Sequence, residues 1–275
     1  MLSHIEPQNI NLNSIYATNK NDNGNRCSFE LSKSIIIPNN VSCYVKLNSF
    51  KYTNVFYNVT STKNILYYSF NGGVTINTIV VPVGNYTVNT LITALSSAGF
   101  TLTYSSLSFK LTIVNTTPFI LLNGTNDISR VLGYQSFSTP TTSYICRNSI
   151  NLLGSQVINI QLQGANISTT TTANGVPSVL ESVPINVSAG SSFSYTPNSN
   201  TEFKCNNISI TTIYINLTDE YNEDLNLLGS SFFVSLHFRF LYPNELRLDR
   251  GLDNLGDATF GLEDVDTELP QEVNG

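Results

Sequence analysis

The segment from residue 231 to 241 alternates between apolar and polar side chains more regularly than any other part of the chain. One set of alternate positions is apolar, and the set between them carries Ser235, His237 and Arg239. The apolar set is Phe232, Val234, Leu236, Phe238 and Phe240. Because successive side chains of a β-strand point to opposite faces, this pattern predicts a strand with one face against a core.

Shorter segments elsewhere repeat this character. The chain is rich in Val, Ile, Thr, Phe and Tyr, with 41% hydrophobic and 11% aromatic residues, which favours strands. Further strands are predicted at residues 27–31, 41–47, 64–70, 75–81, 143–147, 155–162, 178–187 and 203–217. A length of 275 residues favours one core with an insertion. We therefore expect an all-β fold, an antiparallel β-sandwich of the single jelly-roll type.

A small α+β insertion is predicted at about residues 85–135. From Thr87 to Gly99 the apolar positions recur at helical spacing, with Thr87 placed to cap the start and Gly99 the end. A hairpin follows at residues 100–114, and Asp127–Gly133 has the pattern of a short helical turn. Before this insertion, Asn71-Gly72-Gly73 supplies the positive φ angles that a tight hairpin turn requires.

The two ends differ in composition from the middle of the chain. Residues 1–24 are polar with few apolar positions, and we expect a flexible N-terminal arm. Residues 25–243 form the predicted jelly-roll domain. Residues 244–275 lose the strand pattern and become acidic, which predicts a flexible C-terminal tail.

Charge and cysteine usage exclude several classes of protein. The net charge of −6 argues against nucleic-acid binding, and no apolar run approaches the roughly 20 residues of a membrane span. The N-terminus does not have the pattern of a secretory signal, so we expect a cytosol-like compartment. The four cysteines, which have no CxxC spacing, are then expected to be reduced and buried: Cys27, Cys43, Cys146 and Cys205.

Residues for chemistry are scarce. The two histidines are His4, in the expected arm, and His237, on the outward face of a strand, so a His-based triad or zinc site is not expected. There is no phosphate-binding loop or nucleophile elbow. We predict no enzyme, no cofactor, and no catalytic, cofactor-binding or metal residue. One alternative stays open, because the acidic turn Asp219–Asp224 concentrates oxygen ligands that calcium prefers.

Several stretches resemble the minor capsid (penton) proteins of virophages, polintons and adintoviruses. Val81–Ile92, the hairpin after it and Ile128–Tyr134 are similar to an insertion in that family. Val179–Gly190 is a further stretch, and Ile213–Gly229, leading into Phe232–Phe238, is similar to the closing strands. The resemblance covers roughly residues 40–243.

The resemblance implies a structural subunit of the virion. It would form homopentamers at the vertices of an icosahedral shell, beside double-jelly-roll major capsid proteins, after assembly inside the host cell. Two alternatives remain open: a cement-type minor capsid protein, or a jelly-roll module that binds a host receptor or glycan.

Overall fold

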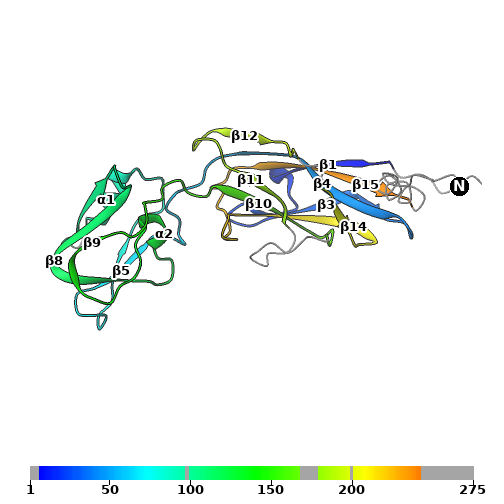
Figure 1. The fold of residues 1–275 in the computed structure, drawn as a ribbon. Helices are drawn as coiled ribbons and strands as arrows, with labels where there is room; N and C mark the ends of the chain where they lie inside the picture. Colours follow the sequence, from blue (N-terminus) through cyan, green and yellow to red (C-terminus); the bar gives the residue numbers. More distant parts are fainter. Residues whose placement is uncertain (1–5, 97–98, 168–178, 199–200, 243–275) are drawn as a thin grey trace, which may run out of the picture.

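The computed structural model describes residues 6–96, 99–167, 179–198 and 201–242. The expected acidic tail and His4 lie outside these residues. The described part is built almost entirely of antiparallel strands, with two short helices and one 3-10 turn. It folds into a two-sheet sandwich with five strands in each sheet and a second, smaller unit, which lie end to end in Figure 1.

Two sheets form the sandwich. The first has the order β1-β15-β4-β12, with β13 also paired to β4, and the second has the order β11-β10-β14-β3-β2. The bounds of these strands are β1 Gln8–Asn13, β2 Asn19–Lys20, β3 Arg26–Ile36, β4 Ser42–Thr53, β10 Val157–Gln163, β11 Val179–Pro184, β12 Ser192–Tyr195, β13 Phe203–Cys205, β14 Ser209–Thr218 and β15 Phe232–Leu241.

The strand order defines the fold as a jelly roll. The eight principal strands can be numbered 1 to 8 in chain order, as β1, β3, β4, β10, β11, β12, β14 and β15. With these numbers the strand order of the first sheet is 1-8-3-6. The second sheet reads 5-4-7-2. This is the order of a double-sheet jelly roll, in which the chain crosses repeatedly from one sheet to the other. The predicted fold class is therefore confirmed.

The sandwich core is formed by the inward positions of both sheets. Phe50 of β4 and the Phe232 and Phe238 side chains of β15 are fully buried, and they face Ile158, Ile160 and other aliphatic residues of the second sheet. The alternation that predicted β15 thus points its apolar set inward. Each fully buried side chain of this size contributes roughly 2 kcal/mol through apolar burial.

Some local predictions were refined by the sheets. The strands predicted at 27–31 and 41–47 are β3 and β4, which lie in opposite sheets and do not pair with each other. The single strand predicted at 203–217 is two strands, β13 and β14, which also lie in opposite sheets. Strand β12, which pairs Ser192–Tyr195 with β4, was not predicted, because it lies in a stretch with turn-forming composition.

The N-terminal segment differs from the expected arm. Strand β1 pairs antiparallel with β15, placing Leu12 opposite Val234. Leu12 is buried in the sandwich core, and the buried Ser14 hydroxyl oxygen accepts a hydrogen bond from the Phe232 amide at 2.9 Å. The segment is polar because an edge strand with one solvent-facing side needs few apolar residues to join a sheet. It supplies the first strand of the jelly roll.

We expect Leu12→Ala to destabilise the protein by about 2–4 kcal/mol, because it removes buried apolar contacts of a sheet strand. The matched control is Asn11→Ala, on the exposed face of the same strand, which should change stability by less than about 0.5 kcal/mol. Urea unfolding measures the free energy of unfolding of both variants. Equal, small effects would indicate that this segment is not part of the folded core.

The second unit has its own sheet and its own core. Its sheet has the order β6-β5-β8-β7, with β9 also paired to β8. The bounds are β5 Ile65–Ser69, β6 Asn77–Val80, α1 Val88–Leu95, β7 Thr101–Ser105, β8 Lys110–Leu122, α2 Ser129–Leu132 and β9 Thr141–Ile145. Its buried cluster runs from Val59 to Cys146, so the inserted unit extends beyond both ends of the expected range 85–135. The strands β5 and β6 belong to it rather than to the sandwich.

Local signals within this unit were read correctly from the sequence. Strands β5 and β6 form the predicted hairpin, and Gly72 and Gly73 have positive φ angles in its turn. Helix α1 begins after Thr87, whose side chain accepts a hydrogen bond from the Thr90 amide, while Thr90 caps in return. The helix ends at Leu95, earlier than the predicted end at Gly99.

The molecule has two distinct ends. The second unit is inserted between β4 and β10, the third and fourth principal strands, and lies at one end of the sandwich. Strands β1 and β15 carry the described chain termini, and both termini lie at the other end (Figure 1). We name the inserted unit the insertion, and the contact region between it and the sandwich the joint.

Candidate functional site at the joint

Two connecting segments carry the chain between the sandwich and the insertion. They are residues 54–64 on the outgoing side and 146–156 on the returning side. The Asn58 side chain binds across them: its amide nitrogen donates to the carbonyl oxygens of Tyr86 at 2.8 Å and Leu152 at 3.1 Å. Its side-chain oxygen accepts from the Tyr86 amide at 2.9 Å. One asparagine therefore holds both connectors against the insertion.

The loop after β14 carries the acidic turn that the sequence singled out. Asp219 is buried, and one of its carboxylate oxygens, Oδ1, accepts hydrogen bonds from the amides of Tyr221 at 2.9 Å and Glu223 at 2.8 Å. The Asp219 carbonyl oxygen accepts from the side-chain amide of Asn159 at 2.7 Å. Asp219 thus fixes the shape of its own loop and anchors that loop to the second sheet.

The other carboxylate oxygen of Asp219 faces the insertion. Its Oδ2 lies 3.5 Å from the ammonium nitrogen of Lys63, which comes from the outgoing connector and is itself nearly buried. Glu223 lies beside it, 3.9 Å from the same ammonium group and 3.1 Å from the Arg130 guanidinium at the start of α2. The Thr62 hydroxyl donates to Glu223 at 2.9 Å. The sandwich loop supplies the anions, the outgoing connector supplies the Lys63 cation and the insertion supplies the Arg130 cation.

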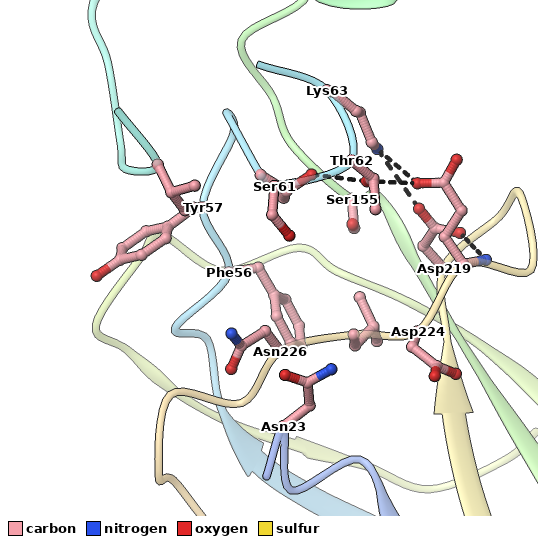
Figure 2. Close-up of a pocket in the computed structure, with 14 residues that line it drawn as sticks. Asn23, Phe56, Tyr57, Ser61, Thr62, Lys63, Ser155, Asp219, Asp224 and Asn226 are labelled. Atoms are coloured by element: carbon pink, nitrogen blue, oxygen red, sulfur yellow. Dashed lines mark hydrogen bonds and ion pairs between the residues drawn. The ribbon is translucent and has the colours of Figure 1, made fainter. Parts of the chain in front are cut away.

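An aromatic ring completes the joint. The Tyr221 ring lies beneath both cations, 4.5 Å from the Arg130 guanidinium carbon and 5.3 Å from the Lys63 nitrogen, distances typical of cation–π contacts. Beside these groups is a small cavity of about 150 Å³, lined by Phe56, Ser155, Asn226 and their neighbours. Figure 2 shows Lys63 and Asp219 approaching each other from separate segments at the edge of this cavity.

Burial sets the charge state of this site. Desolvation raises the pKa of the Asp219 carboxyl, and the backbone hydrogen bonds and the Lys63 ammonium only partly offset that effect. Burial therefore opposes the charged form of the Asp219 carboxyl, while its backbone hydrogen bonds and Lys63 favour that form. What the arrangement can do chemically is to fix the orientation of the insertion relative to the sandwich through charged groups.

The alternative of a calcium site can now be compared with the geometry. The carboxylates of the turn already face donors: Asp219 and Glu223 face Lys63, and Asp224 pairs with the Arg26 guanidinium at 2.7 Å. Glu220 accepts from the Gln156 amide at 3.3 Å. Across the residues that the structure describes, no three or more His, Cys, Asp or Glu side chains gather in a way that could hold a metal ion.

The structure also describes His237, the four cysteines and the helices. His237 lies on β15, where its Nδ1 is 2.8 Å from the side-chain oxygen of Asn9 on β1. All four cysteines are buried with free thiols. Within the described residues, no helix is long and apolar enough to cross a membrane.

Sequence reasoning found the acidic side of the joint but missed its basic side. Lys63 and Arg130 lie 67 positions apart in the sequence, and neither belongs to a motif. The available signal was only their rarity, since the chain has 13 Lys and Arg residues in total. Their convergence depends on how the connectors fold back, which no local pattern encodes.

Comparison with solved structures found similar chains, whereas the two sequence-based comparisons found none. A scan against protein-family models found no match, and neither did a search of curated proteins. One of the similar solved structures is that of a selenomethionine-labelled mavirus penton protein, with a TM-score of 0.48 and 12% identity, covering 86% of this chain and 100% of that one. The fold assignment itself rests on the strand order of this chain.

We expect Lys63→Met to destabilise the protein by roughly 3 kcal/mol, because it leaves the buried Asp219 carboxylate without its cation. Arg130→Met is the matched control, since its partly exposed guanidinium contacts the same loop, and it should cost about 1 kcal/mol or less. Thermal unfolding of both variants checks the ranking. The reverse order would indicate that Arg130, and not Lys63, holds the joint.

A second expectation concerns pH. Because the folded-state pKa of Asp219 is raised, the folded protein binds this proton more readily than the unfolded chain does. The contribution of Asp219 to stability is therefore greatest at acidic pH and is lost as pH rises through the raised pKa. Relative to Asp219→Asn, the wild type should gain stability as pH falls from 7 toward 4. A relative loss, measured by urea unfolding, would mean that Lys63 lowers the pKa instead.

Proposed function

We propose that this protein is a structural capsid subunit that forms homopentamers at the vertices of an icosahedral shell. The observation that carries the proposal is the two-ended shape of a single jelly roll, with the insertion at one end and both described termini at the other (Figure 1). A shell subunit requires such a difference between its ends, because one faces outward and one faces inward. The sequence resemblance to penton proteins supports the same role.

The open edges of the sandwich suit lateral association. In the described part, β1 and β12 lie at edges of the first sheet, and β11 and β2 at edges of the second. Edge strands carry backbone groups that pair with or pack against neighbouring chains. Five copies packed side by side around a closed axis would use the same two edges in each subunit, as a cyclic head-to-tail assembly requires.

The surface chemistry fits a subunit held by many contacts. Charged residues make up only 12% of the chain, and Asn, Ser and Thr provide most of the remaining polarity. Such a surface can form numerous weak, uncharged contacts with its own copies and with a double-jelly-roll major capsid protein, and repetition raises the overall affinity. In this proposal the protein is a component of the virion and carries out no catalysis.

Native mass spectrometry of the purified full-length chain tests the proposal. The expected species is a pentamer, with five times the chain mass of 30.2 kDa. A discrete dimer, trimer or hexamer would contradict it. If the chain alone is monomeric, co-expression with the major capsid protein and imaging of the particles decides the question, because the density at the vertices must then fit five copies.

The same measurements separate the alternatives. A cement-type protein would occupy positions beneath the shell and not at its vertices. A receptor-binding or glycan-binding module is favoured by one observation, the highly exposed apolar side chains in hairpin turns of the insertion, Val74 at 86% and Leu107 at 95% exposure. Binding of the monomer to a glycan array would support that second function.

A further inference from the structure

Two of the four cysteines face each other across neighbouring strands. Cys43 lies on β4 and Cys205 on β13, and the antiparallel register places them directly opposite one another. Both side chains are buried in the sandwich core, with exposures of 0% for Cys43 and 4% for Cys205. No local pattern predicts this pair, because 162 positions of the sequence separate the two residues.

The strand register meets the geometric requirement of a disulfide bond. Directly opposed residues of an antiparallel pair have Cα atoms about 4.5 or 5.5 Å apart, depending on whether they exchange hydrogen bonds. Both separations fall within the roughly 4.4–6.8 Å span of Cα atoms joined by a disulfide. The backbone register therefore already provides the Cα separation that a disulfide needs.

We propose that Cys43 and Cys205 form an intramolecular disulfide when the protein meets a small peroxide oxidant. One thiolate attacks the peroxide, which gives a sulfenic acid and releases hydroxide. The second thiol then attacks the sulfenic sulfur, forms the S–S bond and releases water. Overall, two thiols and one hydrogen peroxide give one disulfide and two molecules of water. The thiols are oxidised and the peroxide oxygens are reduced.

The two opposed thiols affect each other's ionisation. The Cys205 side chain lowers the pKa of the Cys43 thiol, and burial opposes this effect. Because thiolates are the reactive species, whichever of the two thiols is ionised attacks the peroxide, and the other one resolves the sulfenic acid.

A short strand gives the oxidant access. Strand β13 has three residues and pairs with β4, with one further bridge between Cys205 and Ile167. A segment held by so few backbone hydrogen bonds opens locally at low free energy, which admits a molecule as small as hydrogen peroxide. The disulfide, once formed, would fix β13 to the edge of the first sheet.

Thiol counting and peptide mapping test the proposal on the full-length protein. The reduced chain has four thiols by titration after denaturation, and treatment with hydrogen peroxide should lower this number to two. Non-reducing peptide mass spectrometry should recover the peptide of Cys43 linked to that of Cys205, and reduction with dithiothreitol should restore all four thiols. This wild-type experiment does not depend on the folding of any variant.

Matched variants identify the residues. Cys27 and Cys146 are equally buried but lie in the second sheet and in the insertion, so Cys27→Ser and Cys146→Ser should each still lose two of their three thiols. Cys43→Ser and Cys205→Ser should form no intramolecular disulfide. Four thiols remaining in the treated wild type, or a linkage between any other two cysteines, would overturn the proposal.

Discussion

Burial of one face of each sandwich sheet against the other is the interaction on which the rest of the structure depends. Strand β15 is central to it, because it pairs with β1 on one side and β4 on the other. Its buried phenylalanines meet aliphatic residues from the opposite sheet. The jelly-roll connections can cross from sheet to sheet only because this shared core fixes both sheets together, with a total gain proportional to the apolar area removed from water.

The insertion has a separate core, so burial alone does not fix its orientation. Its sheet and helices bury their own cluster from Val59 to Cys146. The connection to the sandwich instead uses polar groups: Asn58 between the connectors, and the pairing of Lys63 and Arg130 with the loop after β14. Directional contacts of this kind specify an angle, whereas apolar burial tolerates rotation.

The joint also illustrates why a cluster of acidic residues in a sequence does not define a metal site. Asp219 uses one oxygen to shape its own loop and turns the other toward an ammonium group. A metal ligand and a salt-bridge partner are the same residue type, and only the neighbours decide between them. Here the neighbours are Lys63 and Arg130, which arrive from a distant part of the chain.

The sequence by itself determined the strand-rich character of the chain, the hairpin at Asn71–Gly73 and the cap at Thr87, because each depends on residues within a few positions of one another. Tertiary structure alone decided that Gln8–Asn13 joins the first sheet, that β3 and β4 part into opposite sheets, and that β5 and β6 belong to the insertion. It also brought Lys63 to Asp219 and Cys43 to Cys205. These outcomes depend on pairing between segments far apart in the chain. The sequence around an edge strand or a single cation does not predict which distant residue it will contact.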